Sequence, residues 1–141
     1  MSERKTIRQA IQRRFPAIKR DDSLETAINK MTKGNVSVLA VLAEGELIGL
    51  VTISDIMFRL TNENNPKDTI VSTLMTTCGS HTARGTRNPC LQLDEDEDAL
   101  SAIKVMYGTG VNHLLVTGTN GKAVGIVSSL EIVKLFNTST I

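Results

Sequence analysis

The chain contains one sequence unit twice. Residues 49–60 read GLVTISDIMFRL and residues 125–136 read GIVSSLEIVKLF, with the opening glycine and several apolar residues in matching places. Two copies of one unit in a single chain predict two similar halves related by pseudo-two-fold symmetry. A pair of this kind forms a cleft between its halves, and that cleft is the first place to look for function.

The repeat covers almost the whole chain. The further matches are Thr6, Ile7 and Ile11 with Thr69, Ile70 and Leu74; Pro16, Ala17 and Ile18 with Pro89, Cys90 and Leu91; Ala27, Ile28 and Met31 with Ala102, Ile103 and Met106; and Val36, Leu39 and Val41 with Val111, Leu114 and Val116. The spacing between partners increases after the first set, so the second copy carries extra residues within 77–88. We therefore predict two repeats, residues 1–66 and 67–141, that form one module, because either repeat alone would bury only a marginal core.

The charge of the chain is balanced overall but uneven along its length. The net charge is +1, while residues 1–20 hold seven basic side chains and one acidic, and residues 94–98 are all acidic. We interpret the acidic run as a solvated first helical turn and the basic start as the polar face of a helix. Nucleic-acid or anion binding through the basic start is an alternative, disfavoured because the chain has no Trp and only three Phe and one Tyr to stack on bases.

Nothing in the sequence predicts export or a membrane. The first twenty residues lack the apolar core of a signal peptide, and the longest wholly apolar run, Val38 to Ala43, is far too short to cross a bilayer. Cys78 and Cys90 form no C-x-x-C pair, and we interpret them as reduced thiols. We therefore expect a cytoplasmic protein.

Cap and turn signals divide each copy into the order α-β-α-β-β-α. In the first copy we expect a short helix at 6–13, an extended segment at 16–19, a helix capped by Asp22 or Ser23 and ended by Gly34, strands at 36–42 and 47–53, and a helix from Ser54 that buries Ile56, Met57 and Leu60. In the second copy, strands near 113–117 and 123–128 flank an Asn120-Gly121 turn. This order predicts an α/β fold with two small sheets covered by helices.

A hydroxyl and a carboxylate stand three residues apart where the last strand of each copy runs into a helix. They are Thr52 and Asp55 in the first copy, and Ser128 and Glu131 in the second. One interpretation is a capping box that satisfies free backbone N–H groups, and Ser128 with Glu131 fits it better than Thr52 with Asp55. The other is a nucleotide site, since a carboxylate beside a helix N-terminus can accept the hydroxyls of a ribose.

The doubled unit, with G-[LI]-V-[TS]-x-x-[DE]-I closing each copy, resembles the cystathionine β-synthase (CBS) domain, and the pair resembles a Bateman module. The resemblance covers essentially the whole chain and implies two clefts that can bind adenosine compounds such as AMP, ADP, ATP or S-adenosylmethionine. It implies that Asp55 and Glu131 hold ribose and that their hydroxyl partners lie near ribose or phosphate. The residues implied to lie near adenine are Ala17 and Ile18 in one copy and Cys90 and Leu91 in the other.

Some residues depart from the family pattern. Glu131 replaces the usual Asp, and Ala40 and Leu115 replace a proline that is common in the central strand. His113 falls where family members often have a polar residue near the cleft, and a histidine simply packed within a strand is the alternative.

The extra residues of the second copy hold Arg84 and Arg87 beside His81, in a Gly- and Thr-rich loop. Such a loop either closes over phosphates, with arginine supplying paired donors, or is a solvated connection.

Enzyme motifs are absent from the sequence, which has no GxxxxGK[ST], no GxGxxG and no metal-ligand spacing. We therefore predict a regulatory module, with no catalytic cofactor, that senses an adenine nucleotide and acts on a separate effector protein. A ligand-free structural dimerisation module is the main alternative.

Three further expectations follow from these residues. The closing helices carry more apolar residues than one packed face uses, which predicts a homodimer. A cleft without a positioned nucleophile or metal predicts no turnover of nucleotides. The longer Glu131 is expected to be partly committed to its capping box, so the Asp55 site should bind more tightly.

Overall fold

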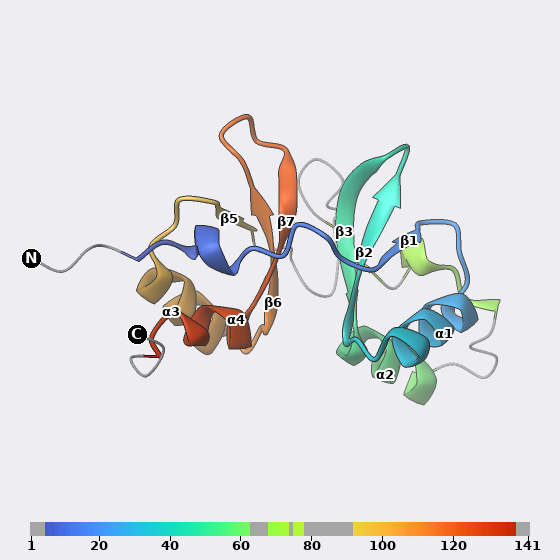
Figure 1. The fold of residues 1–141 in the computed structure, drawn as a ribbon. Coiled ribbons are helices and arrows are strands. Elements are labelled where there is room, and N and C mark those ends of the chain that lie inside the picture. The colour runs from blue at the N-terminus through green and yellow to red at the C-terminus, as the bar shows by residue number, and fades with distance from the viewer. Residues whose placement is uncertain (1–4, 63–67, 74, 78–91, 138–141) are drawn as a thin grey trace, which may run out of the picture. The chain divides into compact units, whose positions relative to one another are not determined.

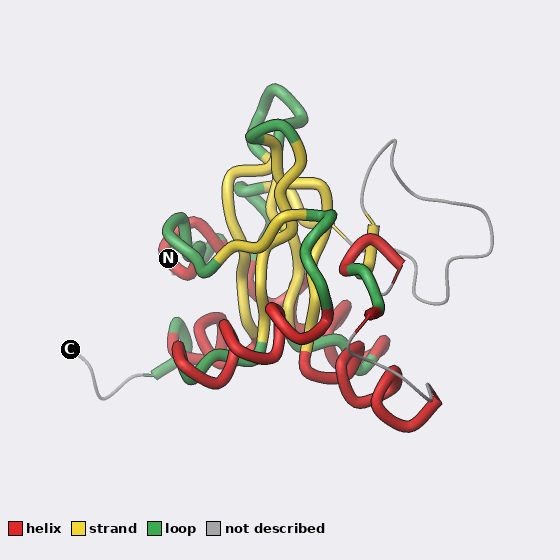
Figure 2. The backbone as a smooth tube through the Cα atoms, turned by 90° about the vertical axis from the view of Figure 1, so that its right-hand side faces the viewer, coloured by secondary structure: helices red, strands yellow, loops and turns green. Residues whose placement is uncertain are grey.

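The computed structural model describes residues 5–62, 68–73, 75–77 and 92–137 (Figure 1). The chain divides into two compact units. We call Phe15–Cys90 the middle unit, and Met1–Arg14 together with Leu91–Ile141 the terminal unit. Figure 2 shows that both strands and helices make up the described parts of the chain, as the predicted α/β class requires.

Each unit contains a mixed sheet with the same core topology. The middle unit consists of β1 (Ala17–Lys19), α1 (Leu24–Gly34), β2 (Val38–Ala43), β3 (Glu46–Thr52), α2 (Ile53–Asn62), η3 (Val71–Thr73) and β4 (Thr76–Thr77). The terminal unit consists of η1 (Ile7–Ala10), β5 (Gln92–Asp94), α3 (Ala99–Thr109), β6 (His113–Thr117), β7 (Ala123–Ser128) and α4 (Ser129–Lys134). The sheet orders are β1-β2-β3-β4 and β5-β6-β7, with β1 and β5 parallel to their neighbours and the other pairs antiparallel.

Local signals set the helix and turn boundaries. Ser23, one of the two residues expected to do so, caps α1, its Oγ accepting a hydrogen bond from Thr26 N at 3.1 Å. The helix runs through the expected Gly34, but the left-handed residue that ends it is Asn35. The β2–β3 turn places both Glu44 and Gly45 at positive φ, which matches the right-handed twist of the flanking strands.

The N-terminal segment Lys5–Arg13, which we call the strap, packs in the terminal unit. Ala99 N donates to Lys5 O at 2.8 Å, and Ile7 N donates to Glu97 O at 3.0 Å. The strap also places two apolar side chains in the core of this unit, since Ile7 and Ala10 are buried. The strap belongs to the first sequence repeat, but it therefore completes the compact unit that contains most of the second repeat.

The start of the second repeat does the same in the middle unit. Leu24 N donates to Thr69 O at 2.7 Å, and Val71 N donates to Asp22 O at 2.8 Å. The compact units therefore do not coincide with the two sequence repeats, which meet at residue 66. The N-terminal segment of each repeat packs in the unit that contains the rest of the other repeat.

These equivalent bonds also correct the sequence alignment of the two starts. Lys5 occupies the position of Thr69, and Ile7 the position of Val71. The sequence comparison, which matched Thr6 with Thr69, was therefore wrong by one residue in this segment.

The strap ends on the edge of β7, and this contact explains the glycine at position 125. Gln12 N donates to Ile126 O at 2.8 Å and Ile126 N donates to Gln12 O at 3.0 Å. A Cβ on Gly125 would lie 2.5 Å from Gln12 O, so no other residue fits without displacing the strap. The matching glycine of the middle unit, Gly49, lies opposite Thr77 of β4.

Two expectations about the helices were wrong. The helix predicted at 6–13 is a 3-10 helix limited to Ile7–Ala10, because Gln12 has to extend to pair with β7. Met57 and Leu60 were predicted to be buried with Ile56, but they are 54% and 50% exposed, and Ile56 is the one that enters the core.

Candidate functional site

The β3–α2 turn of the middle unit forms a complete capping box. Thr52 N and Thr52 Oγ1 both donate to Asp55 Oδ2, at 2.8 and 3.1 Å, and Asp55 N donates back to Thr52 Oγ1 at 3.3 Å. Asp55 is 5% exposed, and among the residues that the structure describes it is the one charged residue that is buried. The carboxylate is therefore held in a fixed place and orientation by its own turn.

The β7–α4 turn of the terminal unit forms only half of such a box. Glu131 N donates to Ser128 Oγ at 3.2 Å, but the Glu131 carboxylate accepts from Lys134 Nζ at 2.9 Å. This side chain is 44% exposed. The expectation that Glu131 makes the better capping box was wrong, because its longer side chain reaches forward to the next turn of the helix.

His113 opens β6 and lies opposite Ser128 in the β6–β7 ladder. Burial lowers the pKa of the His113 imidazole below its ordinary value, because the charged form loses solvation. The imidazole is therefore neutral near pH 7. At the equivalent place in the middle unit, apolar Val38 lies opposite Thr52, so the histidine distinguishes the two turns.

The first strand of each unit carries the residues expected near adenine. Ala17 pairs with Ala40 in parallel β1, and the Ala17 carbonyl accepts from Lys30 Nζ at 2.8 Å. Ile18 is buried in the core.

In the terminal unit the strand register changes this assignment. Gln92 pairs with Leu115, just as Ala17 pairs with Ala40. Gln92 and Leu93 therefore occupy the positions of Ala17 and Ile18. The sequence comparison had placed Cys90 and Leu91 there, and those two residues lie outside the described part of the chain.

The remaining candidates also lie outside the described residues. These are Arg84 and Arg87 of the extra segment, together with His81 beside them. Among the residues that the structure describes, no group of three or more His, Cys, Asp or Glu could hold a metal ion.

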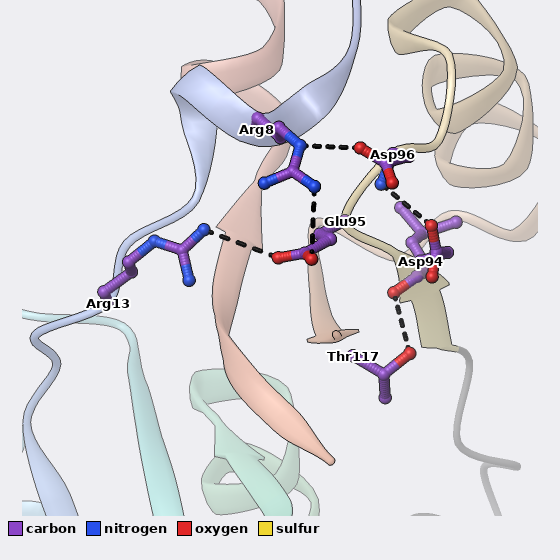
Figure 3. Close-up of polar contacts among 7 residues, drawn as sticks. Arg8, Arg13, Asp94, Glu95, Asp96 and Thr117 are labelled. Carbon is purple, nitrogen blue, oxygen red and sulfur yellow. Dashed lines mark hydrogen bonds and ion pairs between the residues drawn. The ribbon is translucent and has the colours of Figure 1, made fainter. Parts of the chain in front are cut away.

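The acidic run and the basic start bind each other, which sequence reasoning missed. Arg8 Nε lies 2.6 Å from Asp96 Oδ1 and Arg8 Nη2 lies 3.2 Å from Glu95 Oε1, while Arg13 Nη2 lies 3.6 Å from Glu95 Oε2 (Figure 3). The hydrogen bond with Asp96 raises the pKa of the Arg8 guanidinium above its ordinary value. Asp98 caps α3, accepting from Ser101 N at 3.1 Å.

The acidic run at 94–98 is therefore only partly a solvated helical turn. Part of the positive charge of the basic start is neutralised by its ion pairs with this run. Two blocks of opposite charge in one chain were the available signal, but their pairing depends on the packing of the strap.

No helix within the described ranges is long and apolar enough to span a membrane.

Comparison with known proteins identifies the repeated unit. The family model described as "CBS domain" matches residues 7–62 and 85–138. An uncharacterised protein of Methanopyrus kandleri, MK0525, is 26% identical over 116 residues, which is 82% of this chain and 54% of that protein. The CBS domain-containing protein CBSCBSPB1 of Arabidopsis thaliana is 30% identical over 79% of this chain and 19% of its own length. The arabinose 5-phosphate isomerase KpsF of Escherichia coli is 30% identical over 86% of this chain and 34% of its own. The chain thus spans about half or less of these curated relatives.

Solved structures of similar length share the fold. The CBS domain structure NE2398 superimposes with a TM-score of 0.77 at 26% identity, covering 95% of this chain and 98% of that one. CBSX2, solved in complex with AMP, gives a TM-score of 0.76 at 19% identity, covering 96% of this chain and 98% of that one. The CBS pair of MJ0100, solved in complex with 5'-methylthioadenosine and S-adenosylmethionine, gives a TM-score of 0.71 at 23% identity, covering 95% of this chain and 97% of that one.

Proposed function

Because the chain belongs to the CBS-domain family and carries two CBS domains as a tandem pair, or Bateman module, we propose that it is a regulatory module that binds an adenosine-containing compound. AMP, ADP, ATP and S-adenosylmethionine are the candidate ligands, and the bound state acts on a separate effector protein. Support comes from two relatives of the same fold, which were solved with AMP and with S-adenosylmethionine.

The observation that carries this proposal is the Thr52–Asp55 turn. Ribose recognition needs a carboxylate that can accept from two neighbouring hydroxyls, and a carboxylate already fixed by its own turn loses little freedom when it binds. Asp55 is held in this way by two donors of Thr52. In the proposal, Thr52 lies near ribose or phosphate, and the backbone of Ala17 and Ile18 contacts adenine.

The terminal unit offers a second, weaker version of this site. Ser128 and Glu131 replace Thr52 and Asp55, and His113 lies across the ladder from Ser128. Glu131 is held by an exposed ion pair between its Oε1 and Lys134 Nζ and not by its own turn, so its carboxylate is less fixed than that of Asp55. The proposal also includes Arg84 and Arg87 as contacts of this second site, with Gln92 and Leu93 in the positions that Ala17 and Ile18 occupy in the first.

The proposed module does not turn over its ligand. Phosphoryl transfer needs a positioned nucleophile and metal-ion or arginine stabilisation of the transferring group. Incubation with ATP and Mg²⁺ should release no phosphate above that released by Asp55→Ala. Hydrolysis that disappears in Asp55→Ala would mean that the protein is an enzyme.

A calorimetric titration of the purified protein tests the function itself. We expect AMP, ATP or S-adenosylmethionine to bind with measurable heat, and Asp55→Ala to weaken that binding. Glu25→Ala is the matched control, because it removes one exposed acid of α1 away from the turn. If no adenosine compound binds the wild type, the alternative of a ligand-free dimerisation module takes its place.

A homodimer is part of the proposal on a separate observation. The outer faces of the closing helices are apolar, with Met57 54%, Leu60 50%, Leu130 63% and Val133 53% exposed. An apolar face of this kind is typical of a protein interface. Light scattering should give about twice the 15.3 kDa mass of the chain. A 15.3 kDa species at micromolar concentration would contradict the dimer.

A further inference from the structure

The first strand of the middle unit has one side bonded to β2 and one open side. In the described part of this unit, β1 is the end strand of the order β1-β2-β3-β4. On its bonded side, Pro16 O accepts from Ala40 N at 2.9 Å, and Arg20 N donates to Leu42 O at 3.2 Å. Bonds to one neighbour recur at every second residue of a strand. Ala17 is out of step with Pro16 and Arg20, so it presents its carbonyl on the open side.

A lysine of α1 occupies this open carbonyl. Lys30 Nζ donates to Ala17 O at 2.8 Å. Ala17 is half-buried, whereas the Lys30 side chain is exposed. An ammonium group has three N–H donors, and Ala17 O accepts from one of them. A ligand that approaches this carbonyl therefore meets a cationic donor beside the backbone acceptor.

The terminal unit differs at the equivalent position of its helix. Met31 of α1 and Met106 of α3 are matched in the repeat, and both are buried. The residue before Met31 is Lys30, whereas the residue before Met106 is Val105, which packs against the core of the terminal unit. A valine side chain has no hydrogen-bond donor. The cation beside the first strand is therefore a feature of the middle unit and not of the repeated fold.

The contact between Lys30 and Ala17 bears on which purine the middle unit accepts. Adenine carries an amino donor at position 6, which a backbone carbonyl can accept, whereas hypoxanthine and guanine carry an oxygen acceptor there. With Lys30 on the Ala17 carbonyl, an adenine amino group meets an ammonium, and the two donors repel each other. A 6-oxo group instead accepts a charge-assisted hydrogen bond from Lys30. Lys30 thus adds a donor to an edge that would otherwise offer only an acceptor.

We propose that Lys30 is a specificity-determining residue of the middle unit, which lowers the preference of this site for adenine over 6-oxo purines. The inference rests on the proposed function, because it takes the purine to lie against the backbone of Ala17. An adenine nucleotide displaces Lys30 from Ala17 O when it binds. A 6-oxo purine nucleotide keeps Lys30 in place, with the ammonium bridging Ala17 O and the purine oxygen.

Calorimetric titrations with AMP and with inosine monophosphate (IMP) test this choice, because the two share ribose and phosphate and differ in the 6-amino and 6-oxo purine. Lys30→Met should raise the ratio of AMP affinity to IMP affinity by about two- to tenfold, which is the effect of one hydrogen bond. The ratio is taken for the binding phase that Asp55→Ala removes. Lys33→Met is the matched control, because it removes another exposed charge from the same helix. It should leave the ratio unchanged.

The ratio separates purine choice from general attraction, because the attraction of a lysine to phosphate cancels between the two nucleotides. An equal loss of both affinities in Lys30→Met, with the ratio unchanged, would overturn the inference although the binding function stands. If neither AMP nor IMP binds the wild type, the proposed function fails and this inference fails with it.

The NMR resonance of the Ala17 carbonyl carbon tests the contact without any ligand. Lys30→Met should shift this resonance, because the carbonyl loses a charged donor, and Lys33→Met should leave it in place. Unchanged resonances of the buried Leu39 and Val41 would show that the variant is folded. An Ala17 resonance that is the same in the wild type and in folded Lys30→Met would overturn the proposal, whichever nucleotide binds.

Discussion

The two closing turns show how one sequence motif produces two different local structures. In the β3–α2 turn, Asp55 is short enough to return to Thr52 and is buried there. In the β7–α4 turn, Glu131 has one more methylene, extends to Lys134 and remains half exposed. A carboxylate three residues after a hydroxyl therefore does not always form a capping box with it, because the length of the side chain decides which partner the carboxylate reaches.

The largest expected effect is on ligand affinity. Asp55→Ala should weaken adenine-nucleotide binding at the tighter site by roughly 1.5–3 kcal/mol, about ten- to a hundredfold, because a charge-assisted contact to ribose is lost. Glu131→Ala should affect only the weaker site. Calorimetry on both variants separates the two sites. Loss of the tight phase in Glu131→Ala, with Asp55→Ala unchanged, would reverse the assignment.

This ranking of the sites was first expected because Glu131 would be committed to its cap. The structure removes that reason, since Asp55 is the carboxylate held by its turn. The ranking now rests on pre-organisation: Asp55 is already fixed by its turn, whereas Glu131 is held only by an exposed ion pair with Lys134 and has to be ordered when the ligand binds.

The next effect concerns the strand edge that precedes the second turn. Gly125→Ala should lower the free energy of unfolding by about 1–3 kcal/mol, because its Cβ would overlap Gln12 O and force the strap away. Gly108→Ala is the matched control, since nothing lies within 4 Å of its Cβ and alanine favours the helix. Urea denaturation compares the two variants. Equal stabilities would show that the strap does not need this close approach.

The turns should also differ in what their carboxylates contribute to stability. Asp55→Ala leaves Thr52 without its buried acceptor and should cost about 1–2 kcal/mol. Glu131→Ala loses one exposed ion pair and should cost less than about 1 kcal/mol. Urea midpoints of the unliganded variants measure the difference. A larger loss of stability in Glu131→Ala than in Asp55→Ala would show that the carboxylate of the β7–α4 turn contributes more than that of the β3–α2 turn.

The smallest effect is the pH dependence that His113 adds to the terminal unit. Burial lowers the folded-state pKa of this imidazole below the ordinary value of 6.5, so below about that pH the unfolded state binds more protons. The stability of the wild type should therefore decrease as the pH falls through this range. Between pH 7.5 and 5.5, His113→Gln should lose less stability than the wild type. His81→Gln, which removes the other histidine of the chain, serves as the control. Thermal melts of the three proteins at both pH values would show no difference if His113 is solvated.

Much of the fold could be predicted because its signals are local. The strands near 113–117 and 123–128, the Ser23 cap and the Asn120-Gly121 turn each depend on residues only a few positions apart. The family follows from the same repeated motif. Of the candidate site, the pairing of Thr52 with Asp55 was predictable for this reason, although its completeness was not.

What the sequence by itself determined was therefore the repeat, the order of the elements apart from β4, and the pairs of hydroxyl and carboxylate at the two closing turns. The tertiary structure decided that the strap packs in the terminal unit, that Glu95 and Asp96 face Arg8, and that Gln92 rather than Cys90 occupies the position of Ala17. The physical reason is sequence distance. Helix caps and turns form between near neighbours and can be read from local pattern. Contacts between the strap and the acidic run join residues far apart in the chain, and only the packing of Ile7 and Ala10 into the core selects them.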